Sequence, residues 1–446
     1  MRKILMFLST WGSEFSKSLI EGIKERLEKE GENYELHICN AYDDWIFHPI
    51  YKKDNEIFSL VNPDDYDGLI LSFNSVKSLA VIDEVANEFI KKDKPIVSVD
   101  KSYEGASFCG LDNYWSMYRM VEHMITIHDC RTLNYVGGYP DHEENMARFK
   151  AFGDCLKAHG IVVDPKRVVH KSFTIDDGAK AYEEFKKIDF HMPDAVICAN
   201  DKMARGYSEA AIKDGILVPD YLKVTGFDET ILATSYCPSI TTLSRNWKQL
   251  GIDSVDTLLY QIENGRQIEM KYNEGYICFN ESCGCEEARN IREDYNRLVS
   301  INSRRRALDS MQIDVREQLL GSHDFESFQN NLKAGREGLG YADVAVCINS
   351  EIADKGMIDG FEGYSDEVDI YTENDHERAK RTQRLYPDKW RESGEKVFVF
   401  SPMNYSGCTL GYTVMPYRND FFTRATLRKF NEGVTIAVGN IVNRKG

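Results

Sequence analysis

The stretch PDAVICANDKMARGYSEAAIKDGILVPDYLKVTGFDET, residues Pro193–Thr230, decides the fold. Ala195–Ala199 is a short apolar run typical of a buried parallel strand. Asn200 follows as a helix N-cap signal, and after a helix-forming segment a second short strand, Leu222–Thr225, ends just before Asp228. The pattern predicts strand, helix and strand. Because open α/β sheets bind ligands at the carboxyl ends of their strands, Asn200 and Asp228 are expected to face one ligand site.

Alternating strands and helices also fill the rest of the first 285 residues. This alternation implies parallel, right-handed βαβ units, and it restarts after Asp112-Asn113, as if a second lobe began there. Two such lobes can close on a ligand by a hinge. The apolar runs that predict the strands of the first lobe are Ile4–Leu8, Tyr34–Cys39, Tyr66–Ser72 and Pro95–Asp100.

Four segments in this order resemble the effector-binding core of the lactose-repressor/galactose-repressor (LacI/GalR) family, whose fold is that of the sugar-binding periplasmic proteins. They are Ile96–Asn113, Asn134–Gly160, Pro193–Thr230 and Ser239–Gly251. The resemblance implies an α/β, two-lobed, periplasmic-binding-protein-like (type I) domain over residues 1–285. Lobe 1 is expected at about 1–110 and 246–270, and lobe 2 at about 111–243 and 271–285. The family's helix-turn-helix headpiece is not among the matching segments, so no direct DNA binding by this chain is expected.

The resemblance also implies a set of ligand-binding residues. An arginine fork, a carboxylate and an amide suit the hydroxyl groups of a sugar, and aromatic faces suit its apolar side. Trp11 and Phe15 are added because the family's first loop opens onto the effector. The residues that match the family's positions are Asp100, Arg148, Phe173, Asn200, Asp228 and Trp247.

Six of these eight residues have a simpler alternative role. Asn200 can serve only as a helix cap, and Arg148 can be an exposed salt-bridge partner worth under about 1 kcal/mol. Asp100 can be a turn residue and Trp247 can pack in the hinge. Trp11 and Phe15 can belong to the core; the sequence alone leaves these alternatives open.

The composition changes after Cys285. Residues 286–321 are charged and carry apolar residues at heptad spacing, which predicts a helical, coiled-coil linker or a single helix on the domain surface. Residues 322–446 resemble a degenerate, α+β, GAF-like sensory domain ending in a dimer-type helix. In that helix an apolar seam predicts a homodimer: Leu427, Phe430, Val434, Ala437 and Ile441. In proteins with this organisation such a helix leads to an output domain, often a diguanylate cyclase, so an output domain or partner protein is expected.

Charge and motifs exclude several classes of function. The net charge of −17 disfavours nonspecific DNA binding, and the sequence shows neither a secretion signal nor a membrane span, so a cytoplasmic protein is expected. The sequence contains no phosphate loop, dinucleotide-binding motif or catalytic signature, so neither an enzyme nor a cofactor is expected. His142-Glu143-Glu144 lacks the second histidine of a metal motif. Cys283-Gly284-Cys285 lacks the spacing of a structural zinc site, so no metal is expected.

Together these patterns predict a sensor module that binds a small, polar, sugar-like effector and signals through the linker to the GAF-like domain. The input half of a signalling or transcriptional regulator is the main hypothesis. Two alternatives are a LacI-family transcriptional regulator acting on DNA through a partner, and a transport-type solute-binding protein.

Overall fold

The structure is a computed structural model that describes residues 1–9, 11, 13–31, 33–41, 53–72, 80–188, 192–285, 303, 306–307, 310–339, 343–418 and 424–444. It contains two compact units. Unit 1 comprises Met1–Gly110, Trp247–Lys271 and Ser303–Gly446, and unit 2 comprises Leu111–Asn246 and Tyr272–Asn302. The C-terminal residues, expected to form a domain of their own, thus share a compact unit with the first lobe.

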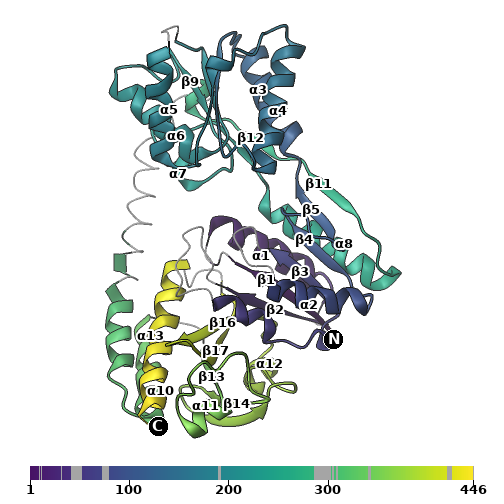
Figure 1. The fold of residues 1–446 in the computed structure, drawn as a ribbon, viewed down its shortest axis with the longest axis vertical. Helices are drawn as coiled ribbons and strands as arrows, with labels where there is room; N and C mark the ends of the chain where they lie inside the picture. Colours follow the sequence, from purple (N-terminus) through teal and green to yellow (C-terminus); the bar gives the residue numbers. More distant parts are fainter. Residues whose placement is uncertain are drawn as a thin grey trace. The chain divides into compact units, whose positions relative to one another are not determined.

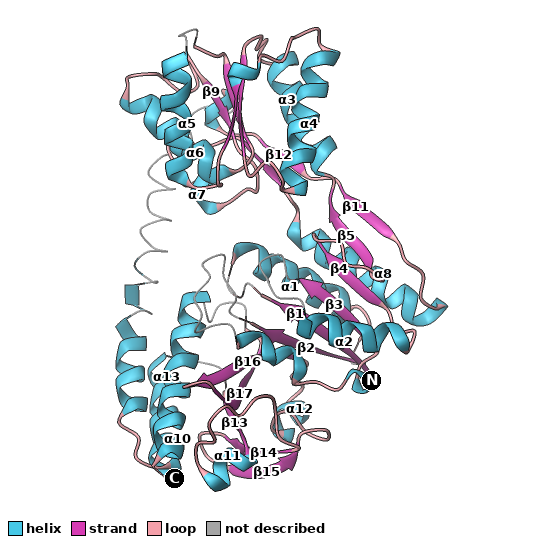
Figure 2. Cartoon of the chain, viewed as in Figure 1, coloured by secondary structure: helices cyan, strands magenta, loops and turns pink. Residues whose placement is uncertain are grey.

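Unit 1 is built on a long mixed sheet with the strand order β11-β5-β4-β3-β1-β2-β16-β17-β13-β14-β15 (Figure 2). The strands β1 to β5 pair in parallel, and β13 to β17 pair with one another in antiparallel fashion. The strands are β1 (Arg2–Leu8), β2 (Tyr34–Asn40), β3 (Gly68–Ser72), β4 (Ile96–Val99), β5 (Ser107–Leu111), β11 (Met270–Asn273), β13 (Ala345–Asn349), β14 (Glu367–Tyr371), β15 (His376–Lys380), β16 (Val397–Tyr405) and β17 (Cys408–Pro416).

The two halves of this sheet meet at a parallel pairing of β2 with β16, from Leu36 opposite Val397 to Cys39 opposite Phe400. An ion pair supports the joint, because Arg391 donates a hydrogen bond of 2.7 Å to the buried Glu35 carboxylate of β2. Burial raises the pKa of Glu35, but His37 and Arg391 outweigh burial and hold this pKa at about 2. A strand that would otherwise be an exposed edge is therefore covered by the C-terminal part of the chain.

Helices pack on this sheet, and two of them cross very closely. A Cβ atom on Gly22 of α1 would lie 1.9 Å from the backbone oxygen of Lys248 of α8, and one on Gly251 of α8 would lie 2.3 Å from that of Leu19. Only glycine allows this approach. The helical segments of unit 1 are α1 (Glu14–Glu28), η2 (Asp54–Ser59), η3 (Pro63–Asp65), α2 (Ala80–Lys91), α8 (Trp247–Asn264), α10 (Phe325–Leu339), α11 (Ser350–Lys355), α12 (Asp388–Glu392) and α13 (Arg424–Asn443).

The apolar seam of the last helix lies inside unit 1. Helix α13 packs against β16, β17 and α10, and Leu427, Phe430, Val434, Ala437 and Ile441 are each at most 3% exposed. The expectation that this seam lies open for pairing with a second copy was therefore wrong, because the chain's own sheet covers it. In the preceding segment, Val315 and Leu319 join the same core, while residues 286–302 of the expected linker lie outside the described residues.

Unit 2 is a four-stranded parallel sheet with the order β7-β6-β8-β9. Helices α3 and α4 pair on one side of it and α5 and α6 on the other (Figure 1). The predicted strand, N-cap and helix around Asn200 are confirmed. The elements are α3 (Asn113–Thr126), β6 (Leu133–Gly137), α4 (Glu143–Ala158), η4 (Pro165–Arg167), β7 (Val168–His170), α5 (Ile175–Ile188), β8 (Ala195–Cys198), α6 (Asp201–Lys213), β9 (Lys223–Thr225), α7 (Ile231–Thr234), β10 (Thr242–Ser244), β12 (Tyr276–Cys278) and η5 (Glu281–Cys283).

Within the described parts of the chain, every helix falls short of the length or the apolar character that crossing a membrane requires.

Candidate functional site

Four of the expected ligand residues lie where strands of unit 2 end. Arg148 is on α4, the helix after β6, and Phe173 lies just beyond β7. Asn200 and Asp228 follow β8 and β9. Since all four strands are parallel, their carboxyl ends share one edge of the sheet, which is where open α/β sheets bind ligands.

Arg148 is held by the protein on every side. Its Nε donates to Asn113 Oδ1 at 2.9 Å and its Nη1 donates to the carbonyl oxygen of Ala199 at 2.7 Å. Its Nη2 donates to Glu144 Oε2 at 2.9 Å. The guanidinium carbon lies 3.7 Å from the centroid of the Phe227 ring. The side chain is only 3% exposed, so the alternative of an exposed surface ion pair is wrong.

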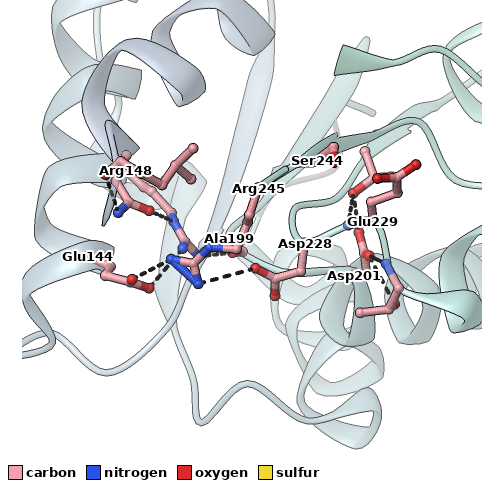
Figure 3. A network of polar contacts seen from close by, with 12 residues as sticks. Glu144, Arg148, Ala199, Asp201, Asp228, Glu229, Ser244 and Arg245 are labelled. Carbon is pink, nitrogen blue, oxygen red and sulfur yellow. Dashed lines mark hydrogen bonds and ion pairs between the residues drawn. The ribbon is translucent and has the colours of Figure 1, made fainter. Parts of the chain in front are cut away.

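Glu144 connects Arg148 to a second arginine and, through it, to Asp228 (Figure 3). Glu144 Oε1 accepts a hydrogen bond from Arg245 Nη2, and Arg245 Nη1 lies 3.9 Å from Asp228 Oδ1. That last distance is beyond a hydrogen bond, so the contact is an ion pair without one. The Asp228 side chain is 30% exposed, whereas that of Arg245 is 8% exposed. Asp228 is thus the accessible end of the ion-pair network, which we define as Glu144, Arg148, Arg245 and Asp228.

The two carboxylates of the ion-pair network have opposite pKa shifts. Burial raises the pKa of Glu144, but Arg245 and Arg148 outweigh burial and lower it overall. Burial raises the pKa of Asp228, and Arg148 and Arg245 only partly oppose this. Glu144 is therefore the fixed anion that neutralises the arginines. Asp228 is a carboxylate whose charged form gains from further hydrogen-bond donors.

Asp201 is a third carboxyl group, fully buried next to the ion-pair network. Burial and the nearby Asp228 raise its pKa to about 8. Hydrogen bonds from Thr230 N at 2.6 Å, Thr230 Oγ1 at 2.9 Å and Thr242 Oγ1 at 2.5 Å oppose that shift. Asp201 ties the segment after β9 and the first residue of β10 to the start of α6, which fixes the backbone that carries Asp228.

Asn200 and Phe173 form a neighbouring polar–aromatic contact. Asn200 Oδ1 caps α6 by accepting from Met203 N at 2.9 Å, and its Nδ2 donates to the Phe173 carbonyl at 3.1 Å. Phe173 has a φ of 66°, which is a strained conformation for a bulky residue. Its ring lies over Gly138, where a Cβ atom would be 1.7 Å from Phe173 Cζ. The cap role of Asn200 is real, and the same side chain also positions Phe173.

The other four expected residues lie in unit 1. The rings of Phe15 and Trp247 are in contact, with centroids 5.0 Å apart. Trp11 is buried in the core, edge-on to Tyr417 at 5.7 Å, in agreement with the alternative of core packing. Asp100 follows β4 with a φ of 63°, and its N–H donates to Cys109 O at 2.9 Å.

The sequence reasoning missed Glu144 and Arg245. A signal for Glu144 was present, because it lies four residues before Arg148 and such pairs meet on a helix. In the sequence, Glu144 also belongs to the incomplete metal motif His142-Glu143-Glu144. Nothing local marked Arg245, since its partner Glu144 lies 101 residues away.

Comparison with known proteins relates this part of the chain to a described family. Residues 121–282 match the family model of the periplasmic binding protein-like domain. This part of the chain is therefore similar to periplasmic binding protein-like domains, including the LacI-type effector domains.

Curated relatives of this domain are transcriptional regulators. The HTH-type transcriptional regulator DegA of Bacillus subtilis is 28% identical over 248 residues, which cover 54% of this chain and 68% of DegA. The arabinose metabolism transcriptional repressor of Halalkalibacterium halodurans is 24% identical over 276 residues, or 60% of this chain and 70% of that protein. The relatives are regulators rather than enzymes.

Solved structures show the same fold. Transcription regulator CcpA of Lactococcus lactis matches with a TM-score of 0.51 at 15% identity, covering 63% of this chain and 99% of CcpA. A complex of the transcriptional regulator CelR with cellobiose matches with a TM-score of 0.50 at 18% identity, covering 63% of this chain and 85% of CelR. The periplasmic-binding-protein-like architecture expected from the sequence is confirmed at the level of the fold.

Proposed function

We propose that this chain is the effector-binding module of a LacI-type transcriptional regulator and that it senses a small, neutral, hydroxylated molecule such as a sugar. The observation that carries the proposal is the ion-pair network at the strand ends of unit 2, with the Asp228 carboxylate at its accessible end. Two arginines and two carboxylates balance in charge. A neutral ligand with several hydroxyl groups suits such a site better than an ion does, because binding it adds no unpaired charge.

The chemistry of the individual groups fits this ligand class. Asp228 offers oxygen atoms that accept hydrogen bonds from hydroxyl groups, and its own charged form gains from accepting them. The Phe173 ring, strained and seated over Gly138, supplies a rigid apolar face of the kind that packs on a sugar ring. Strained backbone at such positions is often part of a binding site, and Asp228 also has a positive φ, of 108°.

The role of Arg148 in this proposal differs from that expected from the sequence. With three hydrogen bonds to the protein and a ring beneath it, Arg148 mainly holds the ion-pair network in place. Asp228 and Phe173 are the proposed ligand contacts. Asp100, Trp11, Phe15 and Trp247 keep a ligand role only as an expectation from the family resemblance.

The relatives favour a transcriptional role over the broader signalling hypothesis. The proposal includes a GAF-like character for residues 322–446. Five antiparallel strands in the order β16-β17-β13-β14-β15, with α10 and α13 packed together, support this part of the proposal. The pairing of β2 with β16 supports a route for the signal, because a shift of the first lobe would move the C-terminal strands directly. A homodimer and a partner that contacts DNA belong to the same proposal.

A thermal-shift panel tests the proposal. Purified protein is melted with arabinose, cellobiose and a set of other neutral mono- and disaccharides, and with sodium glutamate and AMP as charged comparators. A ligand at 100 times its Kd adds about 2.7 kcal/mol to the free energy of unfolding, which raises the melting temperature measurably. A shift with a neutral sugar that is lost in Asp228→Asn supports the proposal. Shifts only with charged compounds, or with nothing in the panel, would count against the ligand class.

A further inference from the structure

Two histidines and two cysteines from distant parts of the sequence converge in unit 2. His123 lies in the last turn of α3 and His128 follows that helix. Cys283 is the last residue of η5, and Cys285 follows after Gly284, which has a φ of 87°. Each offers one ligand atom, and these atoms all lie within 4.8 Å of one another. We call these four residues the His–Cys cluster.

Three of the four atoms form a close triangle. His123 Nε2 is 3.1 Å from His128 Nε2, and Cys285 Sγ is 3.3 Å from the first nitrogen and 3.2 Å from the second. Four donors held 2.0–2.3 Å from one tetrahedral zinc ion would lie about 3.3–3.8 Å from each other. The triangle therefore has nearly the dimensions of one face of a zinc tetrahedron, and Cys283 completes the set from the buried side.

Simple two-centre hydrogen bonds cannot account for all three close contacts of this triangle. The Nε2 atom of a neutral imidazole carries either a proton or a lone pair, so it takes part in one hydrogen bond. If the two nitrogens bond to each other, neither has capacity left for the thiol. If the thiol instead bonds to a nitrogen, no hydrogen bond joins the two nitrogens, although they lie only 3.1 Å apart. A cation bound by all of these atoms at once removes the conflict.

We propose that the His–Cys cluster binds one zinc-type divalent cation through two imidazole nitrogens and two thiolates. Two sulfur and two nitrogen ligands in a tetrahedron select zinc among the common divalent ions, while magnesium and calcium require oxygen ligands. Binding converts the two thiols to thiolates and releases two protons to solvent. With four protein ligands the site is closed, which is the mark of a structural rather than a catalytic zinc site.

The bound ion would tie the C-terminal end of α3 to the segment at Cys285. No sequence pattern indicates this site, because the histidine pair and the cysteine pair are separated by more than 150 residues and neither has a familiar zinc spacing. Asn113, which contacts Arg148, and His123 are ten residues apart on α3, or about 15 Å along the helix. The His–Cys cluster is therefore separate from the ion-pair network, and the proposal does not depend on the proposed effector.

Zinc binding is tested on the untagged full chain, purified in reducing buffer, stripped with a chelator and dialysed against ZnCl2 or MgCl2. We expect about one zinc per chain by elemental analysis, a melting temperature raised by zinc but not by magnesium, and, with Co2+ as the probe, the intense visible absorption of a tetrahedral thiolate site. Cys285→Ser and His128→Gln should each lose all three signals. Cys237→Ser and His159→Gln, which change a cysteine and a histidine outside the cluster, should keep them. Cys285 is exposed, so its variant should still fold, as circular dichroism would verify.

Two results would overturn the proposal. One is a chain that retains less than about 0.2 zinc after dialysis while reduced and folded, since a closed four-ligand site should hold close to one ion. The other is equal zinc retention by the parent and by both cluster variants, which would place the ion elsewhere. A disulfide between Cys283 and Cys285 would also overturn the proposal, because it would remove both thiolates. It would appear as a protein mass that is two hydrogens too low, that returns to the expected mass on reduction, and that maps to these two residues.

Discussion

The guanidinium carbon of Arg148 lies 3.7 Å from the ring centroid of Phe227, while the guanidinium nitrogen atoms donate to Asn113, Ala199 and Glu144. This pairing makes Arg148 the internal support of the strand-end network. A side chain held in this way has little freedom to reorganise around a ligand, so the adaptable part of the site is the partly exposed Asp228.

Replacing Arg148 should therefore destabilise the protein even without a ligand. In Arg148→Ala the Glu144 carboxylate loses one of its two arginines, and breaking a buried ion pair costs about 3–5 kcal/mol of unfolding free energy. Unfolding in urea, followed by tryptophan fluorescence and by circular dichroism, measures this loss of unfolding free energy. The control Arg131→Ala removes an exposed arginine bound to Asp129 and should cost under about 1 kcal/mol. Equal, small losses in both variants would show that the buried bonds of Arg148 do not form.

Adding one methyl group at Gly138 should disturb the aromatic face without touching a charged group. The new Cβ of Gly138→Ala would lie 1.7 Å from Phe173 Cζ, so the ring must leave its place. We expect the apparent affinity for the ligand, derived from thermal shifts at several ligand concentrations, to fall by at least about tenfold. Gly153→Ala, on α4 with its nearest neighbour 3.9 Å away, should bind as the parent does. Unchanged ligand affinity in Gly138→Ala would remove Phe173 from the proposed site.

The buried Asp201 should make stability depend on pH. In the unfolded chain an aspartate loses its proton near pH 3.9, whereas in the folded protein Asp201 has a pKa of about 8. Its contribution to stability is thus fully present below about pH 4 and declines as the pH rises towards about 8. Asp201→Asn cannot titrate, so its melting temperature relative to the parent should increase steadily from about pH 4.5 to about pH 8. The exposed control Asp176→Asn should show no such trend, and a flat difference for Asp201→Asn would mean that Asp201 is ionised when folded.

A charge in the last helix should unfold the protein rather than separate a dimer. Val434 is fully buried against the chain's own sheet, so Val434→Glu should lower the free energy of unfolding by more than about 3 kcal/mol. Lys429→Glu, on the exposed side of the same helix, is the control. Denaturation and light scattering are measured together. If Val434→Glu were a stable, folded monomer while the parent was a dimer, the seam would be a dimer interface and this prediction would be wrong.

Local patterns predicted much of unit 2. The strand before Asn200, its N-cap and the helix after it depend on short-range signals, and the parallel βαβ rule then brought Arg148, Asn200 and Asp228 to one edge of a sheet. Arg245 was missed because its partners are distant in sequence. Charge pairs of this kind leave no periodic trace.

The C-terminal part shows a different limit. Helix α13 has an apolar stripe that suits a dimer seam and suits equally well a helix packed on its own sheet. Periodicity gives the face of a helix but not the surface that covers it. The pairing of β2 with β16 joins residues about 360 positions apart, and the sequence of neither strand identifies the other as its partner.

The central claim is that the accessible Asp228 of the ion-pair network binds a neutral hydroxylated effector. The most direct measurement is native mass spectrometry of the parent, Asp228→Asn and the exposed control Asp176→Asn, each incubated with one pool of neutral mono- and disaccharides. The account predicts that the parent and Asp176→Asn retain the same sugar at one per chain, and that Asp228→Asn retains none while remaining folded. Retention of the same sugar by Asp228→Asn, or of no sugar by any of the three, would contradict it.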